Sequence, residues 1–403
     1  MKTQNLSVWP IFVAALVTEM ATDIYLPAMP QMSRDFNITS GIATHTLTLH
    51  LFAQCIASLF YGALSDAHGR RPLLLSGLSL FVLATFAAAF APNIEWLMVA
   101  RLAQGLGGIS SYVIGLAMVR DVYSEKRALN ILSMLYTTLA IGPAIGPIVG
   151  GHIAEHWGWR GCFLTIGCIA LGVLGLMIVQ LQETHTQRTK KAQGPELMRN
   201  YKSVMQNSIF MRYALISSIA YGGLWAYLAG SPFFFQDVLR LSPAEYGYFH
   251  TFGVVNFILG TTLNRYLLRY LSVHALIRLG LLGLFFTSCS LVVLSQAANQ
   301  KVWFYAVAMI PYSVGLGLMF SNSNNMALDQ CPNVRGTASS VISMMEIVTP
   351  ILTAWTVGHL YDGSLLPTSL VMLITIIIAL GLKWSLSRTR IQNKSVNVTS
   401  KNS

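Results

Sequence analysis

The sequence alternates long apolar stretches with short polar connections along nearly its whole length. A helix needs about 20 apolar residues to cross about 30 Å of hydrocarbon, and stretches of that length recur along the chain. The pattern predicts twelve membrane-spanning helices, at about 9–29, 45–64, 73–91, 96–119, 128–151, 161–182, 213–235, 246–264, 276–295, 302–322, 337–360 and 366–384. The expected fold class is therefore an all-α, multi-pass membrane protein.

The composition supports this expectation. Hydrophobic residues make up 54% of the 403 residues and charged residues only 10%, whereas a soluble chain usually carries about 25% charged residues. So few charges cannot cover a surface that faces water. The net charge of +11 would suggest a nucleic-acid partner in a soluble protein. In a lipid-embedded chain it reports on orientation instead, and no nucleic-acid partner is expected.

The basic residues gather on alternate connections. If the N-terminus is inside, 21 of the 26 Lys and Arg residues fall on inner segments, and Arg101 lies within a span. The outer segments then hold only Arg34, Arg160, Arg240 and Lys301. Because inner loops of membrane proteins collect Lys and Arg, we expect both termini in the cytoplasm and the bundle in a bacterial inner membrane.

One long polar insertion, about 183–212, divides the chain into two sets of six spans and carries six basic residues. It predicts an N-terminal bundle over 1–184, a basic cytoplasmic linker over 185–210 and a C-terminal bundle over 211–386. Residues 387–403 are polar and are expected to form a disordered cytoplasmic tail. A six-plus-six division of this kind is typical of secondary transporters.

Four ionisable residues lie inside predicted spans: Glu19, Asp23, Arg101 and Glu346. An ionisable group at mid-membrane costs about 2.5–3.5 kcal/mol on insertion scales, so it normally faces a partner or a wet cavity. Glu19 and Asp23 are four residues apart and share one helix face. Arg101 is expected at nearly the same depth as Asp23, so an ion pair with either acid is plausible. Glu346 is expected near the midplane.

Two interpretations of this cluster remain open at this point. In the first, the acids bind protons and open to alternate sides of the membrane, with Arg101 opposing their protonation. In the second, Arg101 extends towards the headgroups and the acids are static packing partners. The cost of intramembrane charge favours the first interpretation for Glu19, Asp23 and Arg101, and leaves Glu346 evenly balanced.

Two further segments have unusual composition. The connection Gly62–Pro72 places Asp66 near Arg70, Arg71 and Arg120, with Gly69 at a tight turn. It suits a charged gate, or simply a basic loop with helix caps. The fifth predicted span carries small residues at four-residue spacing and two prolines, which allow close approach and bending. It suits an interface that flexes, or one static helix pair, through Gly142, Pro143, Gly146, Pro147, Gly150 and Gly151.

Polar and aromatic residues within spans are candidates for a substrate cavity. Tyr221 and Trp225 lie deep enough to line a space for an apolar or aromatic solute, although plain packing is an equal alternative. Gln54 and Asn256 are weaker candidates, and Tyr25 is placed in the cavity as well. The five cysteines show no metal-ligand spacing, and no HExxH or GxSxG motif occurs. Neither a metal, a cofactor nor an enzymatic activity is therefore expected.

Together these segments resemble the major facilitator superfamily, specifically its twelve-span drug:proton antiporters. Gly62–Pro72 is similar to the GxLaDrxGRRP signature, Arg101–Gly105 to the RxxxG motif, and Gly142–Gly151 to the GPxxGG antiporter motif. Residues 23–30, which include Tyr25, and Arg120-Asp121 are similar to the Bcr/CflA efflux subfamily. The resemblance covers the chain up to about residue 390.

The resemblance implies two six-helix bundles that work by alternating access, as a monomer, with the proton gradient as the energy source. It implies that Asp23 and Arg101 couple protons and that Asp66, Arg70 and Arg120 lock the cytoplasmic side. Glu19 departs from the family pattern as an added acid, so the main protonation site stays open between Glu19 and Asp23. Glu346 matches no family motif, and we place it in the cavity, where it would suit a cationic or polar substrate.

The sequence thus predicts a proton-coupled exporter of a small organic molecule such as a drug or metabolite. The alternatives are a proton-coupled importer of a small nutrient and a dedicated exporter of a siderophore-like metabolite. A membrane sensor would need a signalling domain, and the longest inner segment is only the basic linker. The motifs do not specify the substrate, because fold and function are separable.

Overall fold

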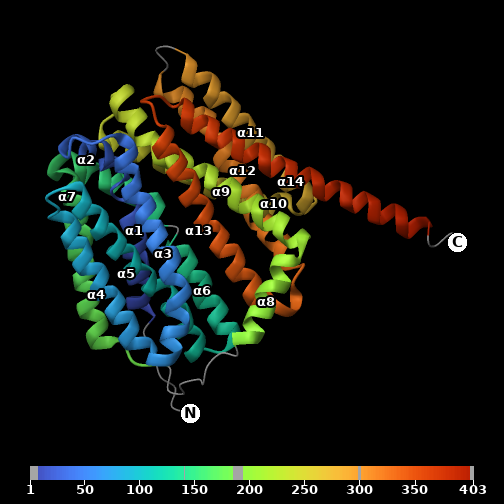
Figure 1. The fold of residues 1–403 in the computed structure, drawn as a ribbon, viewed down its shortest axis with the longest axis horizontal. Helices are drawn as coiled ribbons and strands as arrows, with labels where there is room; N and C mark the ends of the chain where they lie inside the picture. Colours follow the sequence, from blue (N-terminus) through green and yellow to red (C-terminus); the bar gives the residue numbers. More distant parts are fainter. Residues whose placement is uncertain (1–7, 140, 185–193, 298–300, 400–403) are drawn as a thin grey trace. The chain divides into compact units, whose positions relative to one another are not determined.

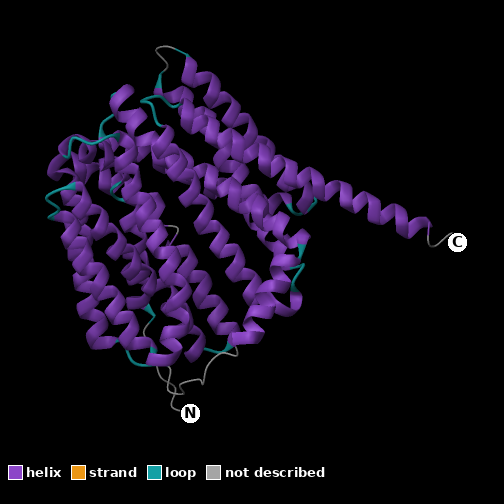
Figure 2. Cartoon of the chain, viewed as in Figure 1, coloured by secondary structure: helices purple, strands orange, loops and turns teal. Residues whose placement is uncertain are grey.

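The computed structural model describes residues 8–139, 141–184, 194–297 and 301–399. Within these ranges every regular element is a helix, and no strand occurs (Figure 2). This result agrees with the expected all-α class.

Two compact units divide the chain, and their helices are labelled in Figure 1. Unit 1 contains residues 1–192 and 229–252, and unit 2 contains residues 193–228 and 253–403. The helices are α1 (Trp9–Asp23), η1 (Leu26–Ala28), α2 (Met29–Asp35), α3 (Ser40–His68), α4 (Arg70–Ala89), α5 (Ile94–Val122), α6 (Glu125–Leu139), α7 (Ile141–Gln180), α8 (Gly194–Gln206), α9 (Ser208–Phe233), η2 (Phe234–Val238), α10 (Pro243–Leu267), α11 (Val273–Gln296), α12 (Val302–Leu328), η3 (Pro332–Val334), α13 (Arg335–Leu360) and α14 (Leu366–Thr399).

Among the described residues, nine helical stretches are long and apolar enough to cross a membrane. One of them, α7, spans 40 residues and contains a break at Gly158, whose φ of 72° is left-handed. The break separates the end of the fifth predicted span from the sixth, while residue 140 between α6 and α7 lies outside the described residues. The predicted spans 213–235 and 246–264 fall on α9 and α10. The count of twelve spans therefore stays a prediction.

Short polar residues set several helix starts. The side chains of Thr39, Asn93 and Ser272 each accept a hydrogen bond from a backbone N–H in the first turn of the following helix. At α10, Ser242 and Glu245 form a reciprocal capping box: the N–H of Ser242 lies 2.7 Å from a Glu245 carboxylate oxygen, and the N–H of Glu245 lies 3.2 Å from the Ser242 hydroxyl.

The segment 229–252 is the main departure from a simple division into two sets of six spans. It contains the end of α9, η2 and the start of α10, and it packs with unit 1. Its Gln236 side chain donates to the carbonyl of Pro27 at 2.7 Å, and its Asp237 forms an ion pair with Arg34 at 2.6 Å. Such contacts are invisible to hydropathy, and the predicted domain boundaries stay a proposal.

Helix also extends into segments that the sequence predicts to be linker and tail. Helix α8 occupies 194–206 of the predicted linker, whereas residues 185–193 lie outside the described part. Helix α14 continues to Thr399, through most of the segment 387–403 that was expected to be disordered. Extending an existing helix by one residue is far easier than nucleating a new one, which accounts for this continuation.

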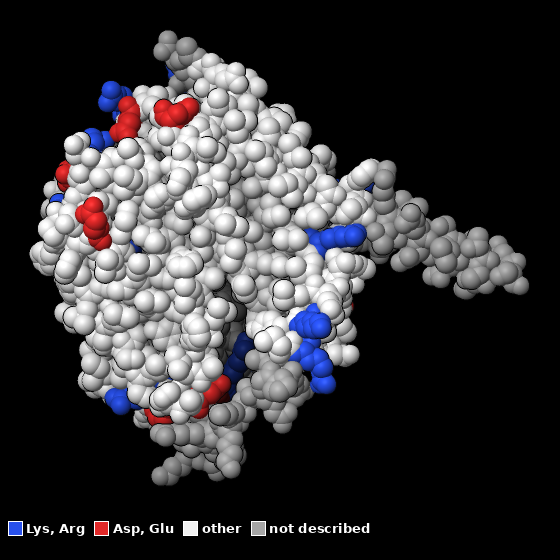
Figure 3. Space-filling view, in the orientation of Figure 1, with Lys and Arg blue, Asp and Glu red and all other residues white. Residues whose placement is uncertain are grey.

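The surface agrees with a membrane setting. On the face drawn in Figure 3, Asp, Glu, Lys and Arg lie mainly towards the ends of the helices, and most of the area between them is uncharged. Large apolar side chains that are more than half exposed include Leu83, Val99, Val179, Phe286 and Val293. Apolar surface of this extent is typical of a lipid-facing protein.

Candidate functional site

The two acids of α1 have opposite environments. Glu19 is the only exposed side chain between Pro10 and Ser33, and Val13, Leu16 and Met20 of the same helix are half-buried. Asp23, one turn further along, is only 5% exposed. One face of α1 therefore carries an accessible carboxyl group and, four residues on, an enclosed one.

The enclosure of Asp23 comes from two neighbouring segments. A Cβ atom added to Gly146 of α7 would lie 3.3 Å from the Asp23 Cβ, so α7 packs directly on the acid. Tyr246 of α10 is close enough to interact electrostatically with Asp23, and its hydroxyl lies 2.8 Å from that of Ser231. Asp23 forms no ion pair within the described part of the chain.

Arg101 is fully buried, but it does not pair with Asp23 or Glu19 as we expected. Its guanidinium donates to the Gln104 side chain and stacks over the Tyr25 ring, 4.4 Å from the ring centroid. Its other bonds are weak, at 3.4 Å to the carbonyls of Ala21 and Thr46. The expected ion pair is absent because the guanidinium lies over the ring of Tyr25, two residues past the end of α1 at Asp23.

A second layer fixes the Arg101 group. The Gln104 amide donates to the hydroxyl of Thr85 at 2.9 Å, which ties α5 to α4. The ring of His50 on α3 lies 3.3 Å from the Arg101 carbonyl, and its Nε2 atom is buried without a partner among the described residues. Gly105 lets α3 approach, because an added Cβ would contact the His50 carbonyl. His50 is thus tied to the RxxxG segment, a link that its position in the sequence does not reveal.

The glycine-rich segment of α7 packs against α1. Gly142, Gly146 and Gly150 face Met20, Asp23 and Ile24, and an added Cβ at Gly150 would collide with the Ile24 carbonyl. Pro147 and Gly151 instead meet residues 243–247 at the start of α10, while Pro143 lies in the first turn of the helix. The segment therefore contacts α1 on one face and α10 on another.

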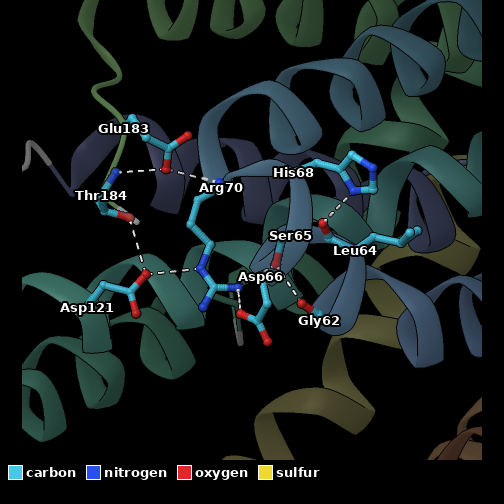
Figure 4. A network of polar contacts seen from close by, with 9 residues as sticks. All are labelled: Gly62, Leu64, Ser65, Asp66, His68, Arg70, Asp121, Glu183 and Thr184. Atoms are coloured by element: carbon cyan, nitrogen blue, oxygen red, sulfur yellow. Dashed lines mark hydrogen bonds and ion pairs between the residues drawn. The ribbon is translucent and has the colours of Figure 1, made fainter. Parts of the chain in front are cut away.

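Three of the predicted gate residues, Asp66, Arg70 and Asp121, form one connected network (Figure 4). The Arg70 side chain is 8% exposed, and its guanidinium reaches Asp66 of α3 at 2.6 Å and Asp121 of α5 at 3.0 Å. The same guanidinium donates to the hydroxyl of Ser65 at 2.5 Å. One buried cation thus joins the end of α3, the start of α4 and the end of α5.

Glu183 is the functional residue that the sequence did not single out. Its carboxylate accepts hydrogen bonds from the backbone N–H groups of Arg70 and Arg71, at 3.0 and 3.1 Å. Gly69, with φ of 101°, precedes α4 and has no side chain to cap these N–H groups, so an acid from beyond α7 takes that role. The available signal was an acid at the end of a span, directly before a basic linker.

The other gate candidates are less connected. Arg71 donates to the carbonyl of Ile178 at 2.8 Å, which again ties α4 to α7. Arg120 is exposed and forms no ion pair among the described residues, so it does not join Asp66 as we expected. Gly62 has open space around its Cβ position.

The remaining cavity candidates lie in different places. In unit 1, Tyr25 is fully buried under Arg101 and beside Phe163, so it packs rather than lines a space, whereas Gln54 is half-buried on α3. In unit 2, Asn256 is buried on α10.

Glu346 of α13 is joined to two other helices of unit 2. The Asn324 amide of α12 donates to the Glu346 carboxylate at 2.8 Å, and the hydroxyl of Ser217 on α9 donates to the Asn324 oxygen at 2.6 Å. On α9, the ring of Tyr221 lies 5.5 Å from that of Phe320 and 6.3 Å from that of Trp225. Tyr221 and Trp225, two of the predicted cavity aromatics, therefore lie one and two turns after Ser217 on α9.

At the opposite end of unit 1 from the gate, Arg34 pairs with Asp237. Partial burial raises the pKa of the Asp237 carboxyl, and the positive charge of Arg34 offsets only part of that effect. The described residues contain no group of three or more His, Cys, Asp or Glu side chains that could hold a metal ion.

Comparisons with known proteins bear on this arrangement. The family model described as Major Facilitator Superfamily matches residues 11–354. The chain is 28% identical over 336 residues to multidrug resistance protein D of Escherichia coli, covering 82% of each chain. It is 22% identical over 364 residues to a bicyclomycin resistance protein homologue of Haemophilus influenzae, covering 90% of each. These relatives agree with the Bcr/CflA resemblance, so the family expected from the motifs is confirmed.

Solved structures show the same fold at low identity. A bacterial homologue of the human lysosomal transporter Spinster, inward-facing and unoccupied, has a TM-score of 0.77 and 13% identity, covering 96% of this chain and 97% of the other. A D-xylose–proton symporter has a TM-score of 0.72 and 14% identity, covering 92% and 96%. Both likenesses concern the fold alone.

Proposed function

The chain belongs to the major facilitator superfamily, and from this premise we propose that it is a proton-coupled exporter of a small organic molecule, working by alternating access. It is a multi-pass transporter of the bacterial inner membrane, and no enzyme occurs among the relatives described above. Proton coupling, the export direction, twelve spans and cytoplasmic termini are parts of the proposal.

One observation carries the proposal: Glu19 is exposed, whereas Asp23, one turn further along the same helix, is enclosed. Bare carboxylates are costly inside a membrane, so a group that exchanges protons must reach water at some stage and be enclosed at another. Glu19 is accessible and Asp23 is enclosed in the same conformation. We infer that Glu19 is the entry group and that Asp23 holds the proton while the protein changes state.

Arg101 is a positioning residue in this scheme. Its charge lies between Tyr25 and Gln104, close to the carbonyl of Ala21 on α1. It therefore raises the positive potential around the end of α1 without neutralising either acid through an ion pair. Solute release follows when proton uptake at Asp23 alters the packing of α1 against the glycines of α7.

We further propose that the Asp66–Arg70–Asp121 network closes the cytoplasmic side when the solute site faces outwards. Its single buried guanidinium joins three helices of unit 1, so movement of any one of them breaks a charged hydrogen bond. The glycine face of α7 supplies the flexible contact with α1. Export is supported by the relatives, two of which are named for drug resistance.

Inside-out membrane vesicles test coupling and direction together. Respiration acidifies the lumen, which quenches acridine orange, and addition of the neutral antibiotic chloramphenicol should restore fluorescence because an antiporter exchanges lumenal protons for external solute. An importing symporter gives no such recovery in inside-out vesicles, because it carries solute and protons out of the lumen together. Glu19→Gln and Asp23→Asn should both abolish the recovery, whereas Glu245→Gln, a surface acid at the start of α10, should preserve it. Unchanged recovery in both span variants would remove the coupling scheme.

A further inference from the structure

Glu346 lies on the packed face of α13. On a helical projection it aligns with Thr349 and Thr353, whose hydroxyls donate to the carbonyls of Ser218 and Gly222 at 2.6 Å. The exposed side chains Leu352 and Trp355 lie on the other side of the same helix. The Glu346 carboxyl group therefore points into unit 2 and away from the surface that lipid would cover.

The carboxylate is held in place but not neutralised. Within the described part of the chain its hydrogen-bond partner is Asn324, and no Lys, Arg or His forms an ion pair with it. Ser217 donates to the Asn324 oxygen and so fixes the amide with its N–H groups towards Glu346. One Asn N–H cannot satisfy a carboxylate, which has about four acceptor positions. The arrangement thus orients an anion and leaves most of its acceptor capacity open.

Aromatic rings follow at the next turns. Because Ser217 meets Asn324 and Tyr221 meets Phe320, α9 and α12 run antiparallel in step, and the ring pair lies one turn, about 6 Å, from the polar pair. Trp225 lies a further turn along α9, and its indole N–H is buried without a partner among the described residues. Tyr221, Phe320, Asn324 and Glu346 are each partly accessible rather than fully packed.

We propose that Glu346, Asn324, Tyr221 and Phe320 form a subsite in unit 2 for the cationic group of an aromatic solute. The carboxylate provides the counter-charge, Asn324 sets its direction, and the rings offer faces on which a cation or an aromatic body stacks. The Trp225 N–H provides a hydrogen-bond donor beyond the rings for a solute that carries an acceptor. This inference rests on the proposed transport function and deepens it, because it names the substrate class.

Equilibrium binding to the purified full-length protein tests the subsite without requiring transport. The probe is radiolabelled tetraphenylphosphonium, a permanent aromatic cation, measured by scintillation proximity in detergent. We expect saturable binding to the wild type, a loss of affinity of about tenfold or more in Glu346→Gln, and no change in Asp329→Asn. Asp329 is a matched acid in unit 2 whose ion pair with Arg335 is more than half exposed.

Two further measurements separate a missing site from a damaged protein. Glu346→Asp keeps the charge and should retain binding within about threefold, because the carboxylate moves by only one methylene. In the vesicle assay, Glu346→Gln should lose the response to tetraphenylphosphonium, whereas Asp329→Asn should keep it. Absence of saturable wild-type binding, or equal affinity in wild type and Glu346→Gln, overturns the subsite. Absence of a vesicle response to both solutes in the wild type instead overturns the transport proposal, and the binding result stands apart from it.

Discussion

The enclosed acid of α1, Asp23, and the acid of α13, Glu346, differ in what surrounds them. Asp23 is enclosed by a glycine face and has no ion pair among the described residues, whereas Glu346 is partly accessible and tied to Ser217 through Asn324. A carboxyl group without fixed donors can gain or lose a proton without breaking a hydrogen-bonded chain. A carboxylate oriented by an amide is prepared to receive a cation. The contrast supports our two proposals, which place proton movement in unit 1 and solute recognition in unit 2.

Asp23→Asn should have the largest effect on proton-driven transport. We expect proton-driven solute movement to fall to the level of vesicles that lack the protein, because the amide carries no exchangeable acid proton. Tetraphenylphosphonium affinity should stay within about twofold, since the two sites share no residue. Acridine-orange recovery and scintillation proximity on the same preparation measure both. A large loss of cation affinity in this variant would show that Asp23 and Glu346 belong to one site.

Arg101→Lys should have the next largest effect. Lysine keeps the charge but loses the planar fork that donates to Gln104 while stacking on Tyr25. Loss of charged hydrogen bonds of this kind costs about 1.5–3 kcal/mol, so transport should fall about 10- to 100-fold. Arg160→Lys is a suitable control, because that arginine is only half-buried and lies 3.7 Å from Asp35. Wild-type transport in Arg101→Lys would show that charge alone suffices.

Particular residues show how far the sequence leads. The apolar run 276–295 matches α11 (Val273–Gln296) closely, because one span length is set by one membrane thickness. Residue counts also give the expected depth of each residue in the membrane, which stays a prediction. Residue counts do not give the direction in which a side chain points around its helix axis. Asp23 and Arg101 are expected at nearly the same depth, yet Arg101 faces Tyr25. The cap that Glu183 places on Arg70 joins positions 113 residues apart, and no local pattern specifies it.

Gly146→Ala tests the packing of α7 on Asp23 in unit 1. Its new methyl group would lie 3.3 Å from the Asp23 Cβ, so α1 or α7 must shift by a few tenths of an ångström. Overpacking of this kind costs about 1–3 kcal/mol, and we expect about a tenfold loss of proton-driven transport. Gly172→Ala on the same helix is the matched control, because nothing lies within 4 Å of its Cβ position. Equal activity of the two variants would contradict the close packing of α7 on the acid.

Ser217→Ala should have the smallest effect and tests unit 2 alone. The hydroxyl of Ser217 holds the Asn324 oxygen at 2.6 Å, so its loss frees the amide to turn away from Glu346. A hydrogen bond of this kind contributes about 1 kcal/mol, so tetraphenylphosphonium affinity should fall about fivefold while chloramphenicol-driven proton release is unchanged. The adjacent Ser218→Ala removes a hydroxyl that donates only to the carbonyl of Ala214, and it should leave affinity unaltered. If the two serine variants bind the cation equally, the amide needs no orientation from α9, and the recognition role falls on the Glu346 charge alone.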